Sequence, residues 1–439
     1  MDAIILTEEM KAAISLLRDE NERFIWISGR AGTGKSTFLQ YMRGEIRPRN
    51  TVYLAPTAVA ALTIGGQTIH SFFWIDPRER AYFETRLDPE REGRLYPLLA
   101  MVETIVLDEI SMVRADLLDE IDRRMRKAKC QAHLPFGGAR LVLFGDAFQL
   151  PPVEPDPCSP EGELFGRRYK SPFFFSSRVF RTKARAIRRV EFTRVFRHTE
   201  ADFIATLDRC RAGAVSNADL DLLQSRVLPE GKKPPASHLI LTATRDEAQR
   251  LNRYRIDALP GPPRSYAAAF SGRFAGMLDD EDLPAPRSLQ LKVGARVMFT
   301  VNGPENRWVN GALATVAALE DNRVVVRDEK GEFPVEPHAW GKLRFTLRSG
   351  QVAEETVDEY RQYPFVLGWA ITMHRAQGRT LENVFVDLSK GAFAAGQAYV
   401  AISRVTKLEG LLLRTRPRAR DFFVNERVTD FLEYIEEKY

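Results

Sequence analysis

The first half of the chain alternates short apolar runs with segments of helical periodicity. Four apolar runs, each followed by polar residues, predict buried strands at Phe24–Ser28, Thr51–Ala55, Thr104–Leu107 and Arg140–Phe144. Such alternation is typical of a parallel sheet covered by helices on both faces. In that architecture ligands bind outside the carboxyl ends of the strands. The polar residues that follow these four runs are therefore the first candidates for a functional site.

A second group of apolar runs predicts a second sheet domain, with strands at His238–Thr242, Val384–Leu388 and Leu411–Arg414. Between the first two of these runs, residues 289–357 alternate apolar and polar positions and carry several glycine turn signals, which predicts a small inserted antiparallel barrel. We expect a linker over residues 253–288, with a polar part at 271–286 that alone favours a plain surface loop. The predicted domains are residues 1–180 and 181–439 of an α/β protein.

Composition narrows the class of protein. A length of 439 residues suggests two to four domains. Hydrophobic residues at 44% and charged residues at 28% exclude a disordered or collagen-like chain. No apolar run has the length of a membrane span, and the acidic start does not resemble a secretory signal. The three isolated cysteines favour a reducing, cytoplasmic setting. A net charge of +5 permits a polyanionic partner but does not demonstrate one.

The segment Gly29–Ser36 matches the phosphate-binding pattern G-x-x-x-x-G-K-[ST] between a predicted strand and a predicted helix. Its glycines allow backbone N–H groups to surround phosphate oxygens. Lys35 would contact the β- and γ-phosphates, and the Ser36 hydroxyl would ligate Mg²⁺. A glycine turn that binds nothing is the alternative, which the strand–loop–helix context opposes. The predicted nucleotide-binding residues here are Gly29, Gly32, Thr33, Gly34, Lys35, Ser36 and Thr37.

Two further predicted strands end in polar residues that suit the same chemistry. Asp108 and Glu109 follow the third strand, where Asp108 would hold the Mg²⁺ shell and Glu109 would activate the attacking water. A pair of carboxylates that only caps a helix is the weaker alternative, because the phosphate loop supplies a partner. Gln149 follows the fourth strand and is a candidate sensor of the γ-phosphate, although a loop glutamine is usually just solvated. Together these motifs predict hydrolysis of a nucleoside triphosphate.

Arginines of the second half are candidates to complete the site. Arg197 and Arg404 lie in otherwise apolar strings, where burial of a guanidinium without an anionic partner would be costly. Residues 178–197 also hold eight basic side chains and one acid. A solvated face explains that run slightly better than nucleic acid does. Phe72 and its aromatic neighbours would suit stacking on single-stranded bases, although most aromatic residues are core residues.

The order of these motifs resembles that of superfamily-one helicases, and most of all the Pif (petite integration frequency) family, relatives of the RecD and Dda enzymes. The strings that carry the resemblance are GRAGTGKS, APTAVAAL, GGQTIHSFF, VLDEISM, GDAFQLPPV, VFRH, WAITMHRAQGRT and GQAYVAISR. They span residues 24 to 412, almost the whole chain. The resemblance implies two RecA-like lobes with parallel sheets, ATP and Mg²⁺ between them, and single-stranded DNA across both. It also implies a wedge insertion at residues 73–97 and places a small β-barrel at 289–357.

The resemblance also implies roles for residues to which their spacing in the sequence alone assigns no role. Positions matching the family's ATP site are Lys35, Ser36, Asp108, Glu109, Gln149, Arg197, Gln377, Gly378 and Arg404. Positions matching those that touch DNA, or couple it to ATP, are Thr57, His70, Phe72 and His374. Three positions depart from the pattern. Met10 stands near the glutamine with which many relatives read adenine, His198 replaces a glutamine, and Arg375-Ala376 replaces Lys-Ser.

The expected activity is an ATP-dependent 5′-to-3′ DNA helicase that unwinds duplexes at forks, with G-quadruplexes and RNA–DNA hybrids as further substrates. Its expected context is repair, recombination or replication of DNA, with telomere maintenance in eukaryotic relatives. A DNA-stimulated ATPase that remodels protein–DNA complexes without unwinding is the alternative, and a DNA-binding module with a decayed ATP site is a second. We expect a minimal bacterial, cytoplasmic protein that is monomeric and has no membrane partner.

Overall fold

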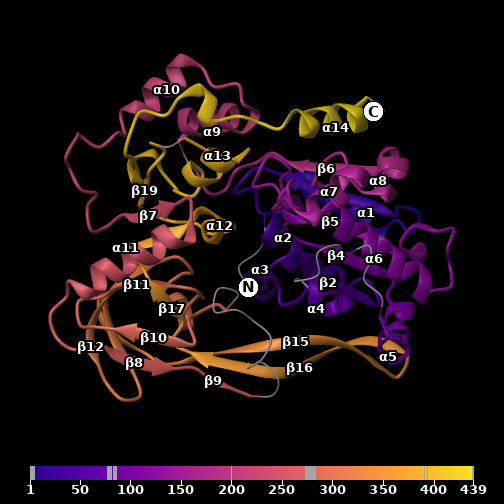
Figure 1. Ribbon diagram of the computed structural model, residues 1–439, viewed down its shortest axis with the longest axis horizontal. Coiled ribbons are helices and arrows are strands. Elements are labelled where there is room, and N and C mark those ends of the chain that lie inside the picture. Colours follow the sequence, from indigo (N-terminus) through magenta and orange to yellow (C-terminus); the bar gives the residue numbers. More distant parts are fainter. Residues whose placement is uncertain are drawn as a thin grey trace. The chain divides into compact units, whose positions relative to one another are not determined.

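The computed structural model describes residues 5–76, 82, 87–198, 200–271, 283–389, 391–392 and 394–437. The chain divides into two compact units, and their elements are labelled in Figure 1. Unit 1 comprises Met1–Phe196, Leu343–Thr356 and Val424–Tyr439, and unit 2 comprises Arg197–Lys342 and Val357–Phe423. Among the described helices, none has the length and apolar character that crossing a membrane requires.

Unit 1 is built on a six-stranded sheet in the order β3-β2-β4-β5-β1-β6, in which all neighbours are parallel. The strands are β1 (Phe24–Gly29), β2 (Thr51–Ala55), β3 (Gln67–Thr68), β4 (Thr104–Leu107), β5 (Arg140–Phe144) and β6 (Ile187–Phe192). Every residue of β1, β4 and β5 is buried, which requires cover on both faces of the sheet. The four strands predicted in the first half are confirmed.

Helices connect and cover these strands. They are α1 (Glu8–Arg18), α2 (Lys35–Tyr41), α3 (Ala58–Thr63), α4 (Ile69–Phe73), α5 (Pro89–Met101), α6 (Ala115–Ala128), α7 (Pro160–Arg168) and α8 (Arg178–Lys183). The α2 helix continues into a π-helical turn at Met42–Ile46. The expected wedge at residues 73–97 includes Tyr82 and the start of α5, while residues 77–81 and 83–86 lie outside the described residues.

The boundary of unit 1 differs from the predicted break at residue 180. Strand β6 pairs with β1 along its whole length, so residues 181–196 belong to the first sheet. The helix α14 (Glu426–Glu436) also belongs to unit 1 and buries Val428, Phe431, Leu432 and Ile435 in its core. The ring of Phe431 stacks on that of Phe175 at a centroid distance of 4.4 Å. This apolar face would be costly to expose, which explains why the chain returns to unit 1 at its end.

A third segment of unit 1 comes from the middle of the chain. Strands β15 (His338–Arg348) and β16 (Gln351–Gln362) form a hairpin whose tip, residues 343–356, belongs to unit 1. The Phe345 ring lies in the core of unit 1, 2% exposed and edge-on to the Phe72 ring at 5.7 Å. Further contacts fasten the tip: the backbone N–H of Val352 donates to the Asn50 side-chain oxygen, and Arg43 pairs with Glu354. The predicted insertion therefore does not stay within the second domain.

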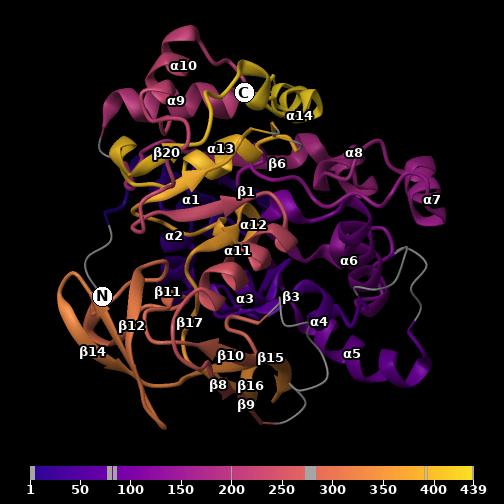
Figure 2. The same cartoon turned by 60° about the vertical axis from the view of Figure 1, so that its left-hand side comes forward.

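Unit 2 contains a four-stranded parallel sheet in the order β18-β7-β19-β20. Figure 2 labels its strand β20 and the helices of this unit. The strands are β7 (Leu239–Thr242), β18 (Ala370–Thr372), β19 (Val384–Val386) and β20 (Leu411–Leu413). The helices of unit 2 are α9 (Ala201–Ala212), α10 (Asn217–Gln224), α11 (Arg245–Asp257), α12 (Met373–Ala376) and α13 (Gln397–Ile402). The predicted second parallel sheet is confirmed, with β18 as a member that the apolar pattern did not single out.

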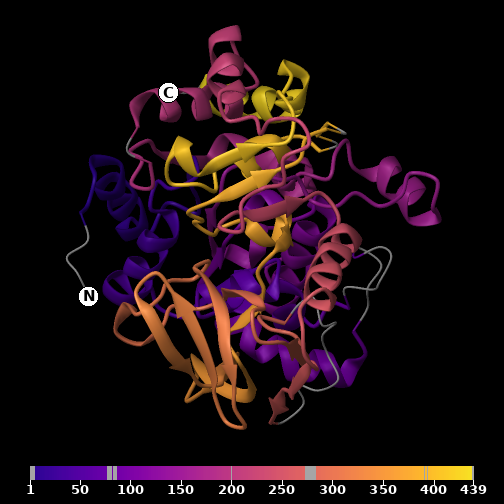
Figure 3. The ribbon, with the colours of Figure 1, turned by 90° about the vertical axis from the view of Figure 1, so that its left-hand side faces the viewer.

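Antiparallel strands make up the rest of unit 2, drawn as orange arrows in Figure 3. One five-stranded sheet has the order β14-β13-β12-β11-β17. Its strands are β11 (Arg296–Phe299), β12 (Leu313–Leu319), β13 (Val324–Asp328), β14 (Gly331–Val335) and β17 (Phe365–Leu367). Strands β8 (Arg264–Ala267) and β10 (Ser288–Leu291) pair with each other, and β9 (Ala269–Phe270) pairs with β16. Residues 253–271 of the expected linker thus lie largely in α11, β8 and β9, whereas residues 272–282 lie outside the described residues.

Candidate nucleotide-binding site

Three adjacent strands of unit 1 end in the polar segments that the sequence singled out. The phosphate loop follows β1, Asp108 and Glu109 follow β4, and the segment with Gln149 follows β5. Because β4, β5 and β1 are parallel neighbours in that order, their carboxyl ends meet at one edge of the sheet. The sequence prediction placed these residues at one edge, and the topology agrees with it.

The loop from Gly29 to Gly34 has a backbone that requires glycine. Gly32 and Gly34 adopt φ angles of 79° and 83°, in the left-handed region that other residues rarely adopt. At Gly29 a Cβ would lie 2.6 Å from the Phe192 carbonyl oxygen, so the neighbouring strand β6 leaves no room for a side chain. The Thr33 hydroxyl donates to the Arg30 carbonyl at 3.0 Å and closes the loop on itself.

The Lys35 ammonium group lies over the loop at the start of α2. Its Nζ donates to the carbonyl oxygens of Gly29 and Arg30 at 2.5 and 2.9 Å. Ser36 and Thr37 follow on the first turn of α2, and both side chains are exposed. This combination of an accessible hydroxyl, an ammonium group and a glycine loop fits a polyphosphate bound with a hard cation.

Asp108, which is buried, and Glu109, which is partly exposed, form an acidic pair at the end of β4. Burial, and next the neighbouring Glu109 charge, raise the pKa of Asp108 to about 7, whereas the Lys35 charge acts in the opposite direction. Glu109 itself has a φ angle of 49°, an uncommon backbone conformation for a residue with a side chain. A carboxylate held at such a cost in desolvation is well placed to bind a divalent cation, because the cation supplies the missing opposite charge.

The loop after β5 is ordered by its own carboxylate. Asp146 is fully buried and its Oδ1 accepts a hydrogen bond from the Phe148 backbone N–H at 3.2 Å. The Gln149 backbone N–H donates to the Asp146 carbonyl oxygen at 3.0 Å, and the Gln149 side chain is 6% exposed. At Gly145 a Cβ would lie 2.9 Å from the Ile110 backbone nitrogen, so this loop packs directly against the segment that follows β4.

Unit 2 brings the two candidate arginines together. Arg404 is 1% exposed, and its guanidinium donates to the Val400 carbonyl and to the Ser403 hydroxyl, both at 2.8 Å. Arg197 donates to the Ser403 carbonyl at 3.3 Å. Burial, followed by the nearby Arg404 charge, lowers the pKa of Arg197 to about 9, so the Arg197 side chain is cationic at neutral pH. Two like charges held close together in a buried setting favour an anionic partner.

The other predicted residues of unit 2 surround the helix α12. Gly378 has a φ angle of 76°, and the Gln377 backbone N–H donates to the His374 carbonyl oxygen at 3.1 Å, so the chain turns sharply after α12. Burial, and next the charge of Arg245, lower the pKa of His374. A neutral His374 can donate and accept hydrogen bonds but adds no charge for a phosphate at neutral pH.

Two of the expected DNA contacts in unit 1 have structural tasks. The Thr57 hydroxyl accepts a hydrogen bond from the Ala60 backbone N–H at 3.2 Å and caps α3. The Phe72 ring is 2% exposed and packs edge-on against Phe73 at 4.9 Å as well as against Phe345. Stacking on a base requires an open ring face. The structure therefore does not support direct stacking of Phe72 on DNA and makes this ring a core residue.

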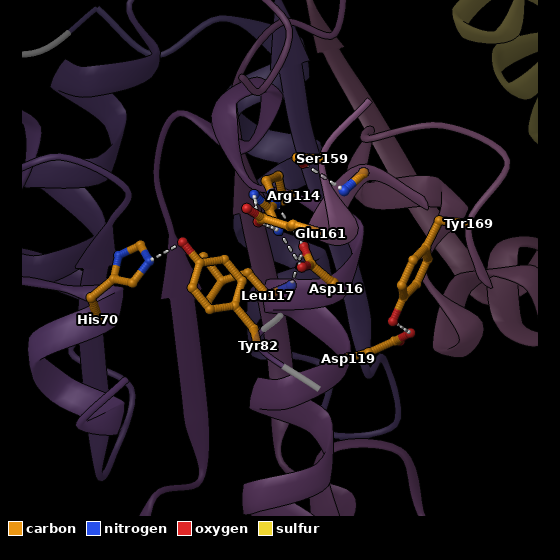
Figure 4. A network of polar contacts seen from close by, with 10 residues as sticks. His70, Tyr82, Arg114, Asp116, Leu117, Asp119, Ser159, Glu161 and Tyr169 are labelled. Carbon is orange, nitrogen blue, oxygen red and sulfur yellow. Dashed lines mark hydrogen bonds and ion pairs between the residues drawn. The ribbon is translucent and has the colours of Figure 1, made fainter. Parts of the chain in front are cut away.

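His70 takes part in a polar network that Figure 4 shows from close by. Its Nε2 lies 3.1 Å from the Tyr82 hydroxyl, and burial lowers the pKa of His70 to about 4. The Arg114 guanidinium lies 4.8 Å from the centre of the Tyr82 ring and pairs with the buried Asp116 and with Glu161. His70 is therefore neutral at physiological pH and bound to its own chain, so it is no cationic contact for a phosphate.

Tyr82 and Phe196 are the residues of this region that sequence reasoning missed. Tyr82 lies twelve positions from His70, a spacing that gives no signal of contact. Phe196 is 42% exposed, and its backbone N–H donates to the Gly32 carbonyl oxygen of the phosphate loop at 2.8 Å. The signal for Phe196 was present, because it directly precedes Arg197 in a string that was already of interest.

A phosphate loop after β1, an acidic pair after β4 at the same edge of the sheet, and a second parallel sheet in a unit with the buried Arg404 define the class of RecA-like P-loop nucleoside triphosphatases. The model of the family described as PIF1-like helicase matches residues 5–219. The ATP-dependent DNA helicase Pif1 of Bdellovibrio bacteriovorus is 30% identical over 440 residues, covering 99% of this chain and 93% of that protein. The chain belongs to the PIF1-like helicase family.

Two further comparisons agree. The mouse ATP-dependent DNA helicase PIF1 is 32% identical over 410 residues, which cover 92% of this chain and 59% of the mouse protein. The chain thus spans somewhat less than two thirds of that relative. The crystal structure of Pif1 from Bacteroides sp. in complex with ADP-AlF4 is 32% identical, with a TM-score of 0.86 over 99% of this chain and 98% of that one. The same protein bound to single-stranded DNA gives a TM-score of 0.68 over the same shares of the two chains.

Proposed function

We propose that this protein is an ATP-dependent DNA helicase that moves 5′-to-3′ on single-stranded DNA and unwinds duplexes. The observation that carries the proposal is the set of polar groups at one edge of the unit 1 sheet. Lys35 follows β1, and Asp108 and Glu109 follow β4, a parallel strand separated from β1 by β5 alone. Two similar proteins, from Bdellovibrio and mouse, are named ATP-dependent DNA helicases, which supports the proposal.

The hydrolytic step follows from the chemistry of these side chains. The loop N–H groups and Lys35 bind the β- and γ-phosphates of ATP and neutralise charge as the terminal bond breaks. Glu109 orients the attacking water and takes up its proton, and Gln149 contacts the γ-phosphate. Arg197 and Arg404 supply further positive charge to the phosphoryl group that is transferred. These roles need no covalent intermediate, because phosphoryl transfer to water depends on positioning and electrostatics.

Ser36 and Asp108 are the residues that would hold Mg²⁺, which supplies charge neutralisation of the phosphates. No group of three or more His, Cys, Asp or Glu side chains in the described part of the chain has the arrangement of a metal site. A magnesium ion shared with a nucleotide needs only one or two protein ligands, because phosphates and water complete its shell. The raised pKa of Asp108 fits such a ligand, since a cation would stabilise its ionised form.

The proposed partners are single-stranded DNA and forked duplex DNA. Supporting them, one similar structure is described as Bacteroides Pif1 bound to single-stranded DNA, and another is described as the basis for DNA unwinding at forked duplex DNA by two coordinating Pif1 helicases. We extend the proposal to G-quadruplexes and RNA–DNA hybrids as substrates, to a monomer in solution and to a role in repair, recombination or replication. The proposed location is the bacterial cytoplasm. In support, the chain matches a bacterial relative over 93% of the length of that relative.

The test is strand displacement on duplexes that carry a 5′ tail, a 3′ tail or a fork. We expect unwinding of the 5′-tailed and forked substrates only, and none with Lys35→Ala, which removes the phosphate contact but leaves the DNA-binding residues in place. Unwinding from a 3′ tail would overturn the polarity. Hydrolysis stimulated by DNA without any strand separation would favour the alternative, a translocase that remodels protein–DNA complexes.

A further inference from the structure

The phosphate loop has an apolar patch on one side, formed by Met10 and Phe196 over Gly34. A Cβ at Gly34 would lie 3.1 Å from the Met10 methyl carbon and 3.6 Å from two ring carbons of Phe196. Two side chains that are far apart in sequence thus meet at the residue where the loop passes into α2. All three residues belong to unit 1.

The two side chains of this patch differ in exposure. Met10 is 2% exposed and forms the floor, whereas Phe196 is 42% exposed and is among the largest apolar side chains that unit 1 leaves open to solvent. The backbone of Phe196 is fixed to the loop through its hydrogen bond to Gly32. An exposed aromatic ring fixed beside a phosphate site is a platform on which the base of a bound nucleotide can stack.

Two of the charged side chains near the patch, Glu9 and Arg30, bind Thr193, and a third, Arg194, lies over the Phe196 ring. The Glu9 carboxylate accepts a hydrogen bond from the Thr193 hydroxyl, and this contact together with that of Thr7 lowers the pKa of Glu9 to about 2. The Arg30 guanidinium donates to the Thr193 carbonyl oxygen at 2.8 Å. The Arg194 guanidinium lies 5.1 Å from the centre of the Phe196 ring. The three heavy atoms nearest to a Cβ at Gly34 belong to apolar side chains, those of Met10 and Phe196.

We propose that Met10 and Phe196 form a base-tolerant platform, so that the protein hydrolyses purine and pyrimidine nucleoside triphosphates with similar efficiency. This inference rests on the proposed function, because it assumes that the loop binds a triphosphate. Every base has a π face, so stacking on Phe196 does not select one base. The thioether of Met10 is a weak hydrogen-bond acceptor and has no donor, so it does not read the polar edge of a base.

The expected difference in kcat/KM between the four triphosphates follows from how strongly polar and apolar binding sites discriminate between related substrates. A site that hydrogen-bonds a polar group of its substrate rejects analogues lacking that group by about 10⁴–10⁵, whereas apolar contacts discriminate by about 10–200-fold. Stacking alone differs still less between bases. We therefore expect kcat/KM for ATP, GTP, CTP and UTP to agree within about tenfold.

The experiment measures steady-state hydrolysis of the four triphosphates by the full chain with saturating single-stranded DNA. Values of kcat/KM within about tenfold of one another support the proposal, and a preference for ATP above about 100-fold overturns it. Hydrolysis of none of the four would instead refute the proposed function itself. The two failures are thus distinguishable.

Two variants test the residues. Met10→Gln introduces an amide donor and acceptor, and it should raise the preference for one base at least about tenfold. Met10→Leu, the matched apolar control, should keep the ratios flat. Phe196→Ala should raise KM for all four substrates by a common factor with kcat little changed, and Phe196→Tyr should restore KM. An unchanged ratio in a folded Met10→Gln protein, or unchanged KM values in Phe196→Ala, would contradict the proposal.

Discussion

Asp108 offers a direct test of the Mg²⁺ site through the proton that it carries. Burial raises its pKa to about 7, so much more of this carboxyl is protonated at pH 6 than at pH 8. Binding of a divalent cation requires the ionised form and lowers the pKa, so the proton must leave. We expect binding of Mg²⁺ with a nucleotide to release more protons from this site at pH 6 than at pH 7, and fewest at pH 8.

The assay is isothermal titration of Mg²⁺-ADP into the protein in buffers that differ in ionisation enthalpy, at each of the three pH values. Asp108→Asn is the matched control, because it keeps the shape of the side chain but cannot release a proton, and it corrects for protons from the nucleotide. The difference between the two proteins is the Asp108 contribution. Equal proton release from both proteins at pH 6 would refute the assignment.

The same shift has a consequence for stability without a cation. The folded-state pKa of Asp108 lies above its ordinary value of 3.8, so the folded chain binds more protons than the unfolded chain between about pH 4 and pH 7. The contribution of Asp108 to stability is therefore most favourable below pH 4 and decreases as the pH rises through 7. Asp108→Asn should raise the melting temperature at pH 8 relative to the unmodified chain and have little effect at pH 4, as measured by calorimetry.

Other predictions concern catalysis, DNA binding and packing. Glu109→Gln should bind ATP but hydrolyse it poorly, and normal turnover in a steady-state assay would contradict the water-activating role. Arg404→Ala should bind a fluorescent ADP analogue almost normally yet lose about 10³–10⁵ in DNA-stimulated rate, unlike the exposed control Arg420→Ala. Affinity for single-stranded DNA should fall steeply across a salt series, since counterions are released, and a flat series would argue against phosphate contacts. Phe345→Ala should destabilise unit 1 by about 3–5 kcal/mol in denaturant unfolding. Leu347→Ala, at an exposed position of the same hairpin, should cost less than about 0.5 kcal/mol.

The nucleotide site could be predicted from sequence because its signals are local. The apolar run Phe24–Ser28, the glycines of the loop and the helical pattern after Lys35 are contiguous, and each is governed by backbone preferences of a few residues. The location of Asp108 at the edge of the sheet could also be predicted, because this residue directly follows a buried strand. Parallel pairing then brings these segments to one edge without further information from the sequence.

The parts that could not be predicted depend on distant contacts. Nothing in the apolar pattern of β15 indicates that Phe345 packs against Phe72, more than 270 positions earlier. The burial of Phe72 follows from that contact, so an expected DNA-facing ring turns out to lie in the core. The network of His70 has the same origin, because Tyr82 and Arg114 approach it only through the folded chain.

The three-segment make-up of unit 1 has a consequence for the order in which the protein can fold during synthesis. The ribosome releases residues 1–196 first, but the hairpin tip at 343–356 and the helix α14 emerge only after most or all of unit 2. Until then the apolar surfaces that receive Phe345 and Phe431 have no cover. All residues of unit 2 precede position 424, so the unit that begins second along the chain can be completed first. A nascent chain of this protein therefore holds its nucleotide-binding unit unfinished until α14 has been synthesised.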